Sequence, residues 1–468
     1  MQIQFATQSY KHPSLPLSAQ RCSNFYAERQ PADAKSQIAV LGVPGLTLLQ
    51  AVGTGPIRGM HVMNSVLYVV SGGNLYSVPK TGAATALGGV IAGTGIVSMS
   101  DNGTQLCIVN GVHGYIYSVT GGFQAITDAN FHAANTVTFF DNYFVFDWLG
   151  TNKYFISAIL DGTTYSGLDF ASAEVQPQNV VSIVNQQENL LIFCTGHIET
   201  WYDSGAVAFP FQRYDGATIE RGCTGSYTPV KEDNSVFFLG DDLIFYRLNG
   251  IIPVRISTHA LEYEWQTYTT TSDAYTFSYT WGGHKFIVLT FPTQLKTFVF
   301  DISTNLWHER ESWDQNNQTY GRWRGNCHIS WFGKELIGDA VNGNIGYLDE
   351  SAYTEYGNTI PGLLVAPPIH SDRKRVFHSR FELDMEFGVG LASGQGSDPQ
   401  AMLDWSNDGG LTFTPLQIWH SIGKQGEYRR RLRWLRLGQA RTRVYRLSIT
   451  DPVKRVIIAA HADLTVGM

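Results

Sequence analysis

Short apolar runs, each bounded by glycine, asparagine or aspartate, recur along the chain from about residue 50 to about residue 365. Strand-like segments of this kind include 66–70 (VLYVV), 104–109 (TQLCIV), 189–193 (NLLIF), 235–239 (SVFFL) and 285–291 (KFIVLTF). Residues that are β-branched or aromatic, placed between turn formers, are typical of β-strands. The pattern predicts an all-β protein, with at most one short helical turn over residues 124–136.

Aromatic residues mark these strands at a nearly regular interval. Seven such anchors are Tyr76, Tyr117, Phe155, Trp201, Tyr246, Phe298 and Tyr347. Their mean spacing is about 45 residues, which is the length of a four-stranded propeller blade. A single blade cannot bury its hydrophobic face alone, so blades stack around a common axis. We therefore expect a β-propeller of seven blades, or of six if the first or last anchor belongs to an incomplete blade.

Two changes in this pattern divide the 468 residues. Residues 1–50 contain four prolines and little alternation, and they predict an irregular N-terminal arm that packs on other domains or subunits. Residues 51–367 carry the blade spacing. Residues 368–468 lose it and show longer alternating segments, which are typical of a separate β-sandwich. The expected order is arm, propeller and C-terminal sandwich.

Composition narrows the classes of protein that the chain can belong to. Charged residues make up only 16% of the chain, which indicates that other subunits cover part of its surface. The five cysteines are far apart, so neither a disulfide framework nor a zinc site is expected. No secretory signal is visible at the N-terminus, and no apolar stretch approaches the ~18 residues of a membrane-spanning helix.

Charge is concentrated near the C-terminus. The chain has a net charge of −7, yet Lys424 to Arg455 contains 11 lysines and arginines against two acidic residues, so this segment carries +9 and the remainder −16. Alternate residues of a strand share a face. If the strands involved pair, five arginines form one positive face and a candidate partner interface: Arg429, Arg431, Arg433, Arg441 and Arg443.

Three interpretations of this basic segment remain open. An acidic protein surface is a plausible partner, because dense arginines repel one another unless they are paired. Nucleic acid is a second, because an aromatic residue, Trp434, lies between the arginines. The third is a solvated sheet face that resists edge-to-edge pairing.

The sequence contains no complete motif for catalysis, phosphate binding or metal binding. The sequence contains no G-x-S-x-G elbow and no P-loop, and the pair His308–Glu309 lacks the second histidine of a zinc-protease motif, because Ser312 stands in its place. Residues 406–413 (SNDGGLTF) match the Asp-box pattern of sialidase propellers. The residues of this Asp-box match are those that a tight turn requires. We nominate no catalytic, cofactor-binding or metal-binding residue, and we keep a glycan-binding or glycan-hydrolysing propeller as the alternative function.

Several segments together resemble a known family. They are NFYAERQP (24–31), VPGL (43–46), GHIETWYDSG (196–205), IERGCTGSYTPV (219–230), VFFLGDD (236–242), IIPVRIS (251–257) and the SNDGG hairpin (406–410). In order and spacing the chain resembles the tail-hub, or nozzle, proteins of short-tailed bacteriophages, also called tail accessory factors or packaged-DNA stabilisation proteins. The resemblance covers nearly the whole chain.

The resemblance implies a structural protein of the virion tail that assembles in the host cytoplasm and has no catalytic residues. Family members form a homohexameric ring below the portal and its adaptor protein, retain packaged DNA, and anchor tailspikes or tail fibres and a needle or plug. Double-stranded DNA then passes through the lumen without sequence-specific binding. An acidic body agrees with this, because basic contacts would instead hold DNA through counterion release.

Overall fold

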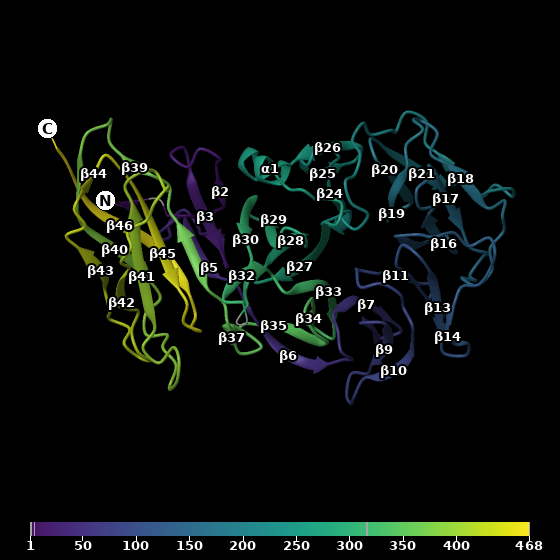
Figure 1. The fold of residues 1–468 in the computed structure, drawn as a ribbon, viewed down its shortest axis with the longest axis horizontal. Helices are drawn as coiled ribbons and strands as arrows, with labels where there is room; N and C mark the ends of the chain where they lie inside the picture. Colours follow the sequence, from purple (N-terminus) through teal and green to yellow (C-terminus); the bar gives the residue numbers. More distant parts are fainter. Residues whose placement is uncertain (1, 4, 315–316, 468) are drawn as a thin grey trace.

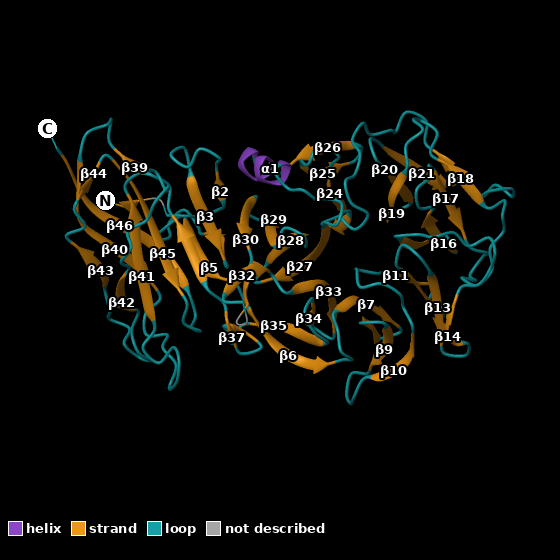
Figure 2. Ribbon diagram, in the orientation of Figure 1, coloured by secondary structure: helices purple, strands orange, loops and turns teal. Residues whose placement is uncertain are grey.

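The computed structural model describes residues 2–3, 5–314 and 317–467. Over these residues the protein is all-β apart from α1 (His259–Gln266) (Figure 2). The helical turn expected over residues 124–136 is wrong, because that segment holds the end of a strand followed by loop. The helix instead follows the fifth blade, where Leu261 and Trp265 are buried in an apolar cluster shared by the fifth and sixth blades.

Four-stranded antiparallel units surround a common centre (Figure 1). Six of the units in the described chain are made of four consecutive strands. They are β7–β10 (Ile57–Met63, Val66–Ser71, Asn74–Val78, Thr85–Gly89), β11–β14 (Ser98–Asp101, Gln105–Val109, Gly114–Ser118, Gly122–Ala125), β15–β18 (Val137–Phe140, Tyr143–Asp147, Lys153–Ile156, Phe170–Ser172), β19–β22 (Val180–Gln186, Asn189–Cys194, Ile198–Asp203, Phe211–Arg213), β23–β26 (Val230–Glu232, Ser235–Leu239, Phe245–Asn249, Ile252–Arg255) and β27–β30 (Tyr275–Trp281, His284–Phe291, Lys296–Asp301, Leu306–Glu309).

A seventh, composite unit closes the ring. It combines β33 (Gly325–Trp331), β34 (Lys334–Asp339) and β35 (Asn344–Asp349) with β6 (Gly45–Ala51) from the N-terminal segment. Strand β6 pairs antiparallel with β35. Joining the first strand of the propeller to its last blade ties the two ends of the ring together. The protein is therefore a β-propeller, as the anchor spacing predicted.

The C-terminal domain is a sandwich of two sheets. One sheet has the order β4-β5-β46-β40-β43, with β1 and β44 at its margins, and the other continues from β30 through β3-β38-β45-β41-β42, with β2 and β39 at its margins. Their bounds are β1 (Gln2–Ile3), β2 (Tyr10–Lys11), β3 (Ala19–Ser23), β4 (Phe25–Arg29), β5 (Ile38–Gly42), β38 (Gly362–Val365), β39 (Ile369–His370), β40 (Val376–Met385), β41 (Gln400–Ser406), β42 (Ile418–Ser421), β43 (Leu432–Leu435), β44 (Gln439–Ala440), β45 (Thr442–Ile449) and β46 (Val456–Val466).

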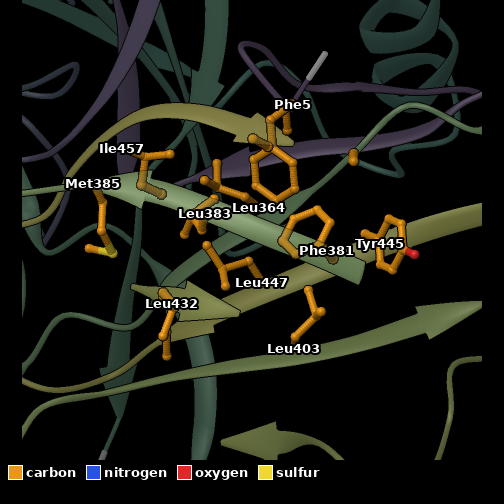
Figure 3. Packing of buried hydrophobic residues seen from close by; sticks show 14 of the residues in the cluster. Phe5, Leu364, Phe381, Leu383, Met385, Leu403, Leu432, Tyr445, Leu447 and Ile457 are labelled. Atoms are coloured by element: carbon orange, nitrogen blue, oxygen red, sulfur yellow. The ribbon is translucent and has the colours of Figure 1, made fainter. Parts of the chain in front are cut away.

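The sandwich core lies between these sheets (Figure 3). Phe381 from β40 and Tyr445 from β45 meet there with ring centroids 4.7 Å apart. Phe5, from the N-terminal segment, lies 6.0 Å from Phe381. The N-terminal segment thus contributes side chains as well as strands to this core.

Two short hairpins complete the fold: β31 (Glu311–Asp314) with β32 (Thr319–Arg322), and β36 (Thr354–Glu355) with β37 (Asn358–Thr359). Strand β36 also joins β6 at the margin of the composite blade.

The N-terminal segment forms strands rather than the irregular structure expected of it. Its strands β1, β3, β4 and β5 belong to the sandwich sheets, and β6 belongs to the propeller. These strands are short and interrupted by prolines, so their alternation is weak, although Cys22 and Phe25 are fully buried. Pairing with distant strands adds to the local pairs β2–β3 and β4–β5 in holding this segment extended.

Candidate partner interface

Strand β43 lies at the margin of its sheet, at the end of the molecule away from the propeller (Figure 1). Leu432 and Trp434 are buried, whereas Arg433 between them is half-buried. The alternation expected here is therefore present. The Trp434 indole N–H donates to the Ile418 carbonyl at 2.9 Å, which holds β43 against β42 of the opposite sheet.

Three of the five predicted arginines lie on or just before β43. Arg429 and Arg431 are exposed in the turn that precedes the strand. The Arg433 Nε lies 3.4 Å from a carboxylate oxygen of Glu382 on the neighbouring β40. This ion pair leaves part of the Arg433 side chain open to solvent, so all three arginines can reach a partner.

The other two arginines do not complete this face, and the expectation of one five-arginine face was wrong. β43 pairs with β40, whereas β45 pairs with β41 in the opposite sheet. Arg441 is exposed before β45, but Arg443 is buried. Its Nε donates to Asn407 Oδ1 at 3.0 Å and its Nη1 donates to the Leu437 carbonyl. Burial lowers the pKa of Arg443.

Exposed apolar side chains accompany the accessible arginines, and the charge pattern alone did not single them out. Tyr428 is 73% exposed and Leu435 is 61% exposed. Trp419 on the adjacent β42 is 61% exposed. Tryptophan, tyrosine and arginine are the residues that most often dominate protein–protein binding energies. We define the basic edge as Tyr428, Arg429, Arg431, Arg433 and Leu435.

The Asp-box segment forms a turn between β41 and β42. The Asp408 carboxylate accepts hydrogen bonds from the Ser406 hydroxyl at 2.5 Å and from the Thr412 amide at 2.9 Å. These bonds, from Ser406 first and then Thr412, hold the pKa of Asp408 well below its usual value. The Gly410 amide donates to the Ser406 hydroxyl at 2.8 Å. The carboxylate is thus engaged by its own hairpin, as expected of a folding element.

Side chains that could bind a metal or act as paired acids are spread out among the described residues. No three histidine, cysteine, aspartate or glutamate side chains in this part of the chain could hold a metal ion together. Asp101 is the one carboxylate among the described side chains that line the centre of the propeller, whereas glycosidases of the usual kind need a pair. No helix in the described ranges is long and apolar enough to cross a membrane.

Fold and sequence together define a two-domain class: an all-β protein with a propeller followed by a sandwich. Two family models match the chain in this same order, "Bacteriophage P22 Gp10, beta-propeller" over residues 1–353 and "Bacteriophage P22 Gp10, beta-sandwich" over residues 362–465. The chain belongs to the family of bacteriophage P22 Gp10, the tail-hub proteins of short-tailed phages. It is thus a structural protein of the phage tail.

Comparison with curated proteins found no significant match. Among solved structures, the extracellular domain of the putative one-component system BT4673 from B. thetaiotaomicron is 9% identical, with a TM-score of 0.44 over 65% of this chain and 40% of that chain. The N-terminal domain of Nup159 is 11% identical, with a TM-score of 0.41 over 69% and 97%. BamB from Moraxella catarrhalis is 10% identical, with a TM-score of 0.38 over 75% and 98%. We draw no conclusion from scores this low.

Proposed function

We propose that the protein forms a homohexameric tail hub that extends the DNA channel below the portal and its adaptor ring. In this role it retains packaged DNA and anchors tailspikes or fibres and a needle or plug. The observation that carries the proposal is the match of both P22 Gp10 family models, in order, along residues 1–353 and 362–465. Electron microscopy of virions tests it: six copies of the chain are expected at the tail, and a position elsewhere in the particle contradicts it.

We propose further that the basic edge contacts an acidic surface in that assembly. The segment that contains it carries +9, and the remainder of the chain carries −16, so a neighbouring copy or the adaptor can supply the complementary charge. Arginine is suited to this contact because its planar guanidinium binds a carboxylate through two parallel hydrogen bonds. The exposed Tyr428 and Leu435 add apolar area beside the charges.

Charge reversal at the basic edge tests this contact. The double substitution Arg431→Glu and Arg433→Glu is expected to leave the subunit folded, because both side chains are at least partly exposed, but to prevent stable incorporation into tails and release DNA from filled heads. Particle assembly and DNA retention are measured together with circular dichroism of the isolated subunit.

Arg373→Glu with Arg375→Glu serves as a matched control. Both arginines are exposed in the same domain, in the loop before β40, and their reversal changes the net charge by the same amount. Normal particles are expected from this control. If the folded basic-edge variant also gives normal particles, its arginines belong to a solvated sheet margin and the contact is rejected.

We also propose that the protein is not an enzyme. The turn-bound Asp408 and the single carboxylate at the described centre of the propeller support this. Purified protein is expected to give no turnover of surface polysaccharide, peptidoglycan or nucleotides. Cleavage that disappears on substitution of one carboxylate instead favours the glycan-hydrolysing alternative.

A further inference from the structure

The centre of the propeller holds a cavity of about 640 Å³. Residues from the innermost strand of every blade line it: β7, β11, β15, β19, β23, β27 and β33. Cavities of roughly 300–1,000 Å³ are of the size that binds small molecules. All the residues that line this cavity belong to one subunit.

The walls of this central cavity combine a larger apolar area with polar side chains. Nine of the described lining residues are serine, threonine or asparagine, with hydroxyl or amide side chains, among them Asn185, Thr138 and Ser182. Two lining histidines are already bound to carboxylates. His61 Nε2 lies 2.6 Å from Asp101 Oδ2, and His328 Nε2 lies 2.5 Å from Glu335 Oε2.

Lys231 differs from these two histidines because, within the described structure, no acidic side chain pairs with its ammonium. Its Nζ donates to the amide oxygen of Asn185 at 2.7 Å, and Asn185 Nδ2 donates in turn to the Phe139 carbonyl at 3.2 Å. The neighbouring Glu232 does not pair with Lys231, because its carboxylate lies 3.0 Å from the Lys285 ammonium.

The position of Lys231 makes its charge available to a ligand. The side chain is exposed to solvent, but it also lines the central cavity. Nearby protein atoms remove enough of its hydration to lower the pKa of the Lys231 ammonium. An ammonium that has lost part of its hydration and has no carboxylate partner gains from a bound anion, and lysine is a common phosphate-binding residue.

We propose that the central cavity binds a small phosphate-bearing molecule, with Lys231 as its charge partner, Asn185 holding that lysine in place, and hydroxyl groups in the walls bonding the remaining polar groups of the ligand. The source of the phosphate can be the free ion or a phosphorylated sugar. Hydroxyl groups in the lining can bond to the free phosphate ion or to a phosphorylated sugar, and the experiment below distinguishes these two ligands.

Calorimetric titration of the full chain with inorganic phosphate, and separately with glucose 6-phosphate, tests the proposal. Saturable one-to-one binding of at least one probe is expected. Lys231→Met is expected to weaken it at least tenfold, whereas Lys231→Arg, which keeps the charge, retains binding within a few-fold. Tighter binding of glucose 6-phosphate identifies the sugar phosphate as the occupant, and equal binding identifies the free ion.

Lys374→Met is the matched control, because Lys374 is exposed in the sandwich, far along the chain from the cavity, and loses the same charge. The Lys374→Met variant is expected to bind both phosphate probes with the same affinity as the wild type. Thermal unfolding of each variant confirms that the propeller is folded. The proposal is overturned if neither probe binds the wild type, or if folded Lys231→Met binds as tightly as the wild type.

Discussion

Arg21, on β3, joins the N-terminal segment to the propeller through two buried carboxylates. Its Nε donates to Glu309 at 3.2 Å and its Nη2 lies 3.1 Å from Glu311. Burial alone would raise the pKa of Glu309, but the charge and hydrogen bonds of Arg21 outweigh it and hold that pKa well below its usual value. A buried carboxylate that keeps its charge depends on its cation, so this contact is sensitive to removal of Arg21.

Substitution Arg21→Met is expected to reduce the free energy of unfolding by about 3–5 kcal/mol at pH 7, because it leaves buried carboxylates without their main cation. In the wild type the depressed pKa of Glu309 contributes stability above its ordinary value of about 4.3, and that contribution is lost as pH falls below it. The variant lacks this contribution, so the difference between the two proteins should narrow mainly as pH falls from about 4.3 toward the lowered pKa of Glu309 at about 2. Urea denaturation across this range measures it.

Lys35→Met provides the comparison, because Lys35 pairs with Asp384 at the surface and its side chain is 67% exposed. Its loss is expected to change stability by less than about 1 kcal/mol. An Arg21→Met variant as stable as Lys35→Met would show that the buried pair contributes nothing to the fold.

The sequence was least informative about the burial and the partners of individual side chains. The charge count identified the basic segment correctly but did not distinguish the exposed Arg431 from the buried Arg443. That difference depends on Asn407 and the Leu437 carbonyl, which only the folded chain brings to the guanidinium. Lys231 was missed for the same reason, since its neighbours in the cavity come from other blades.

Elements of the propeller, in contrast, could be predicted from spacing. All seven aromatic anchors lie on the third strand of a blade, from Tyr76 on β9 to Tyr347 on β35. The third strand is internal to its blade, so a large aromatic side chain at this position recurs at the blade interval. The N-terminal strands were missed partly because several of their partners are hundreds of residues away, as in the pairing of β6 with β35.

Strand β6 also supports a prediction about ring closure. Leu46 is buried in an apolar cluster with Ile337 and Trp323, whereas Leu48 on the same strand is 47% exposed. Leu46→Ala is expected to cost about 2–5 kcal/mol of unfolding free energy, because it leaves a cavity in a packed core. Chemical denaturation followed by tryptophan fluorescence measures the loss.

Leu48→Ala is the control, since it removes the same atoms from the same strand. A loss below about 1 kcal/mol is expected for this partly exposed side chain. Equal losses for the two variants would mean that burial of β6 against the last blade does not stabilise the propeller.

At the scale of the whole molecule, the two domains are interleaved along the chain. The sandwich takes β1, β3, β4 and β5 from before the propeller and β38 to β46 from after it. Its second sheet also continues into the sixth blade, where Ser23 on β3 pairs with Glu309 on β30. The sequence predicted a sandwich over residues 368–468. We propose instead that the folding unit also needs residues 2–44 and 362–367.

This proposal predicts the behaviour of fragments. Residues 368–468 alone lack β4, β5 and β38. Core side chains such as Phe381 and Leu447 then lose packing partners and become exposed to water. We expect this fragment to be unfolded or aggregated. Because Gln2 on β1 pairs with His461 on β46, residues 362–467 can be joined by a short flexible linker to residues 2–44. We expect this permuted chain to give a cooperative unfolding transition and a near-ultraviolet circular dichroism spectrum. Cooperative unfolding of the shorter fragment by itself would show that the predicted limit at residue 368 already encloses a complete domain.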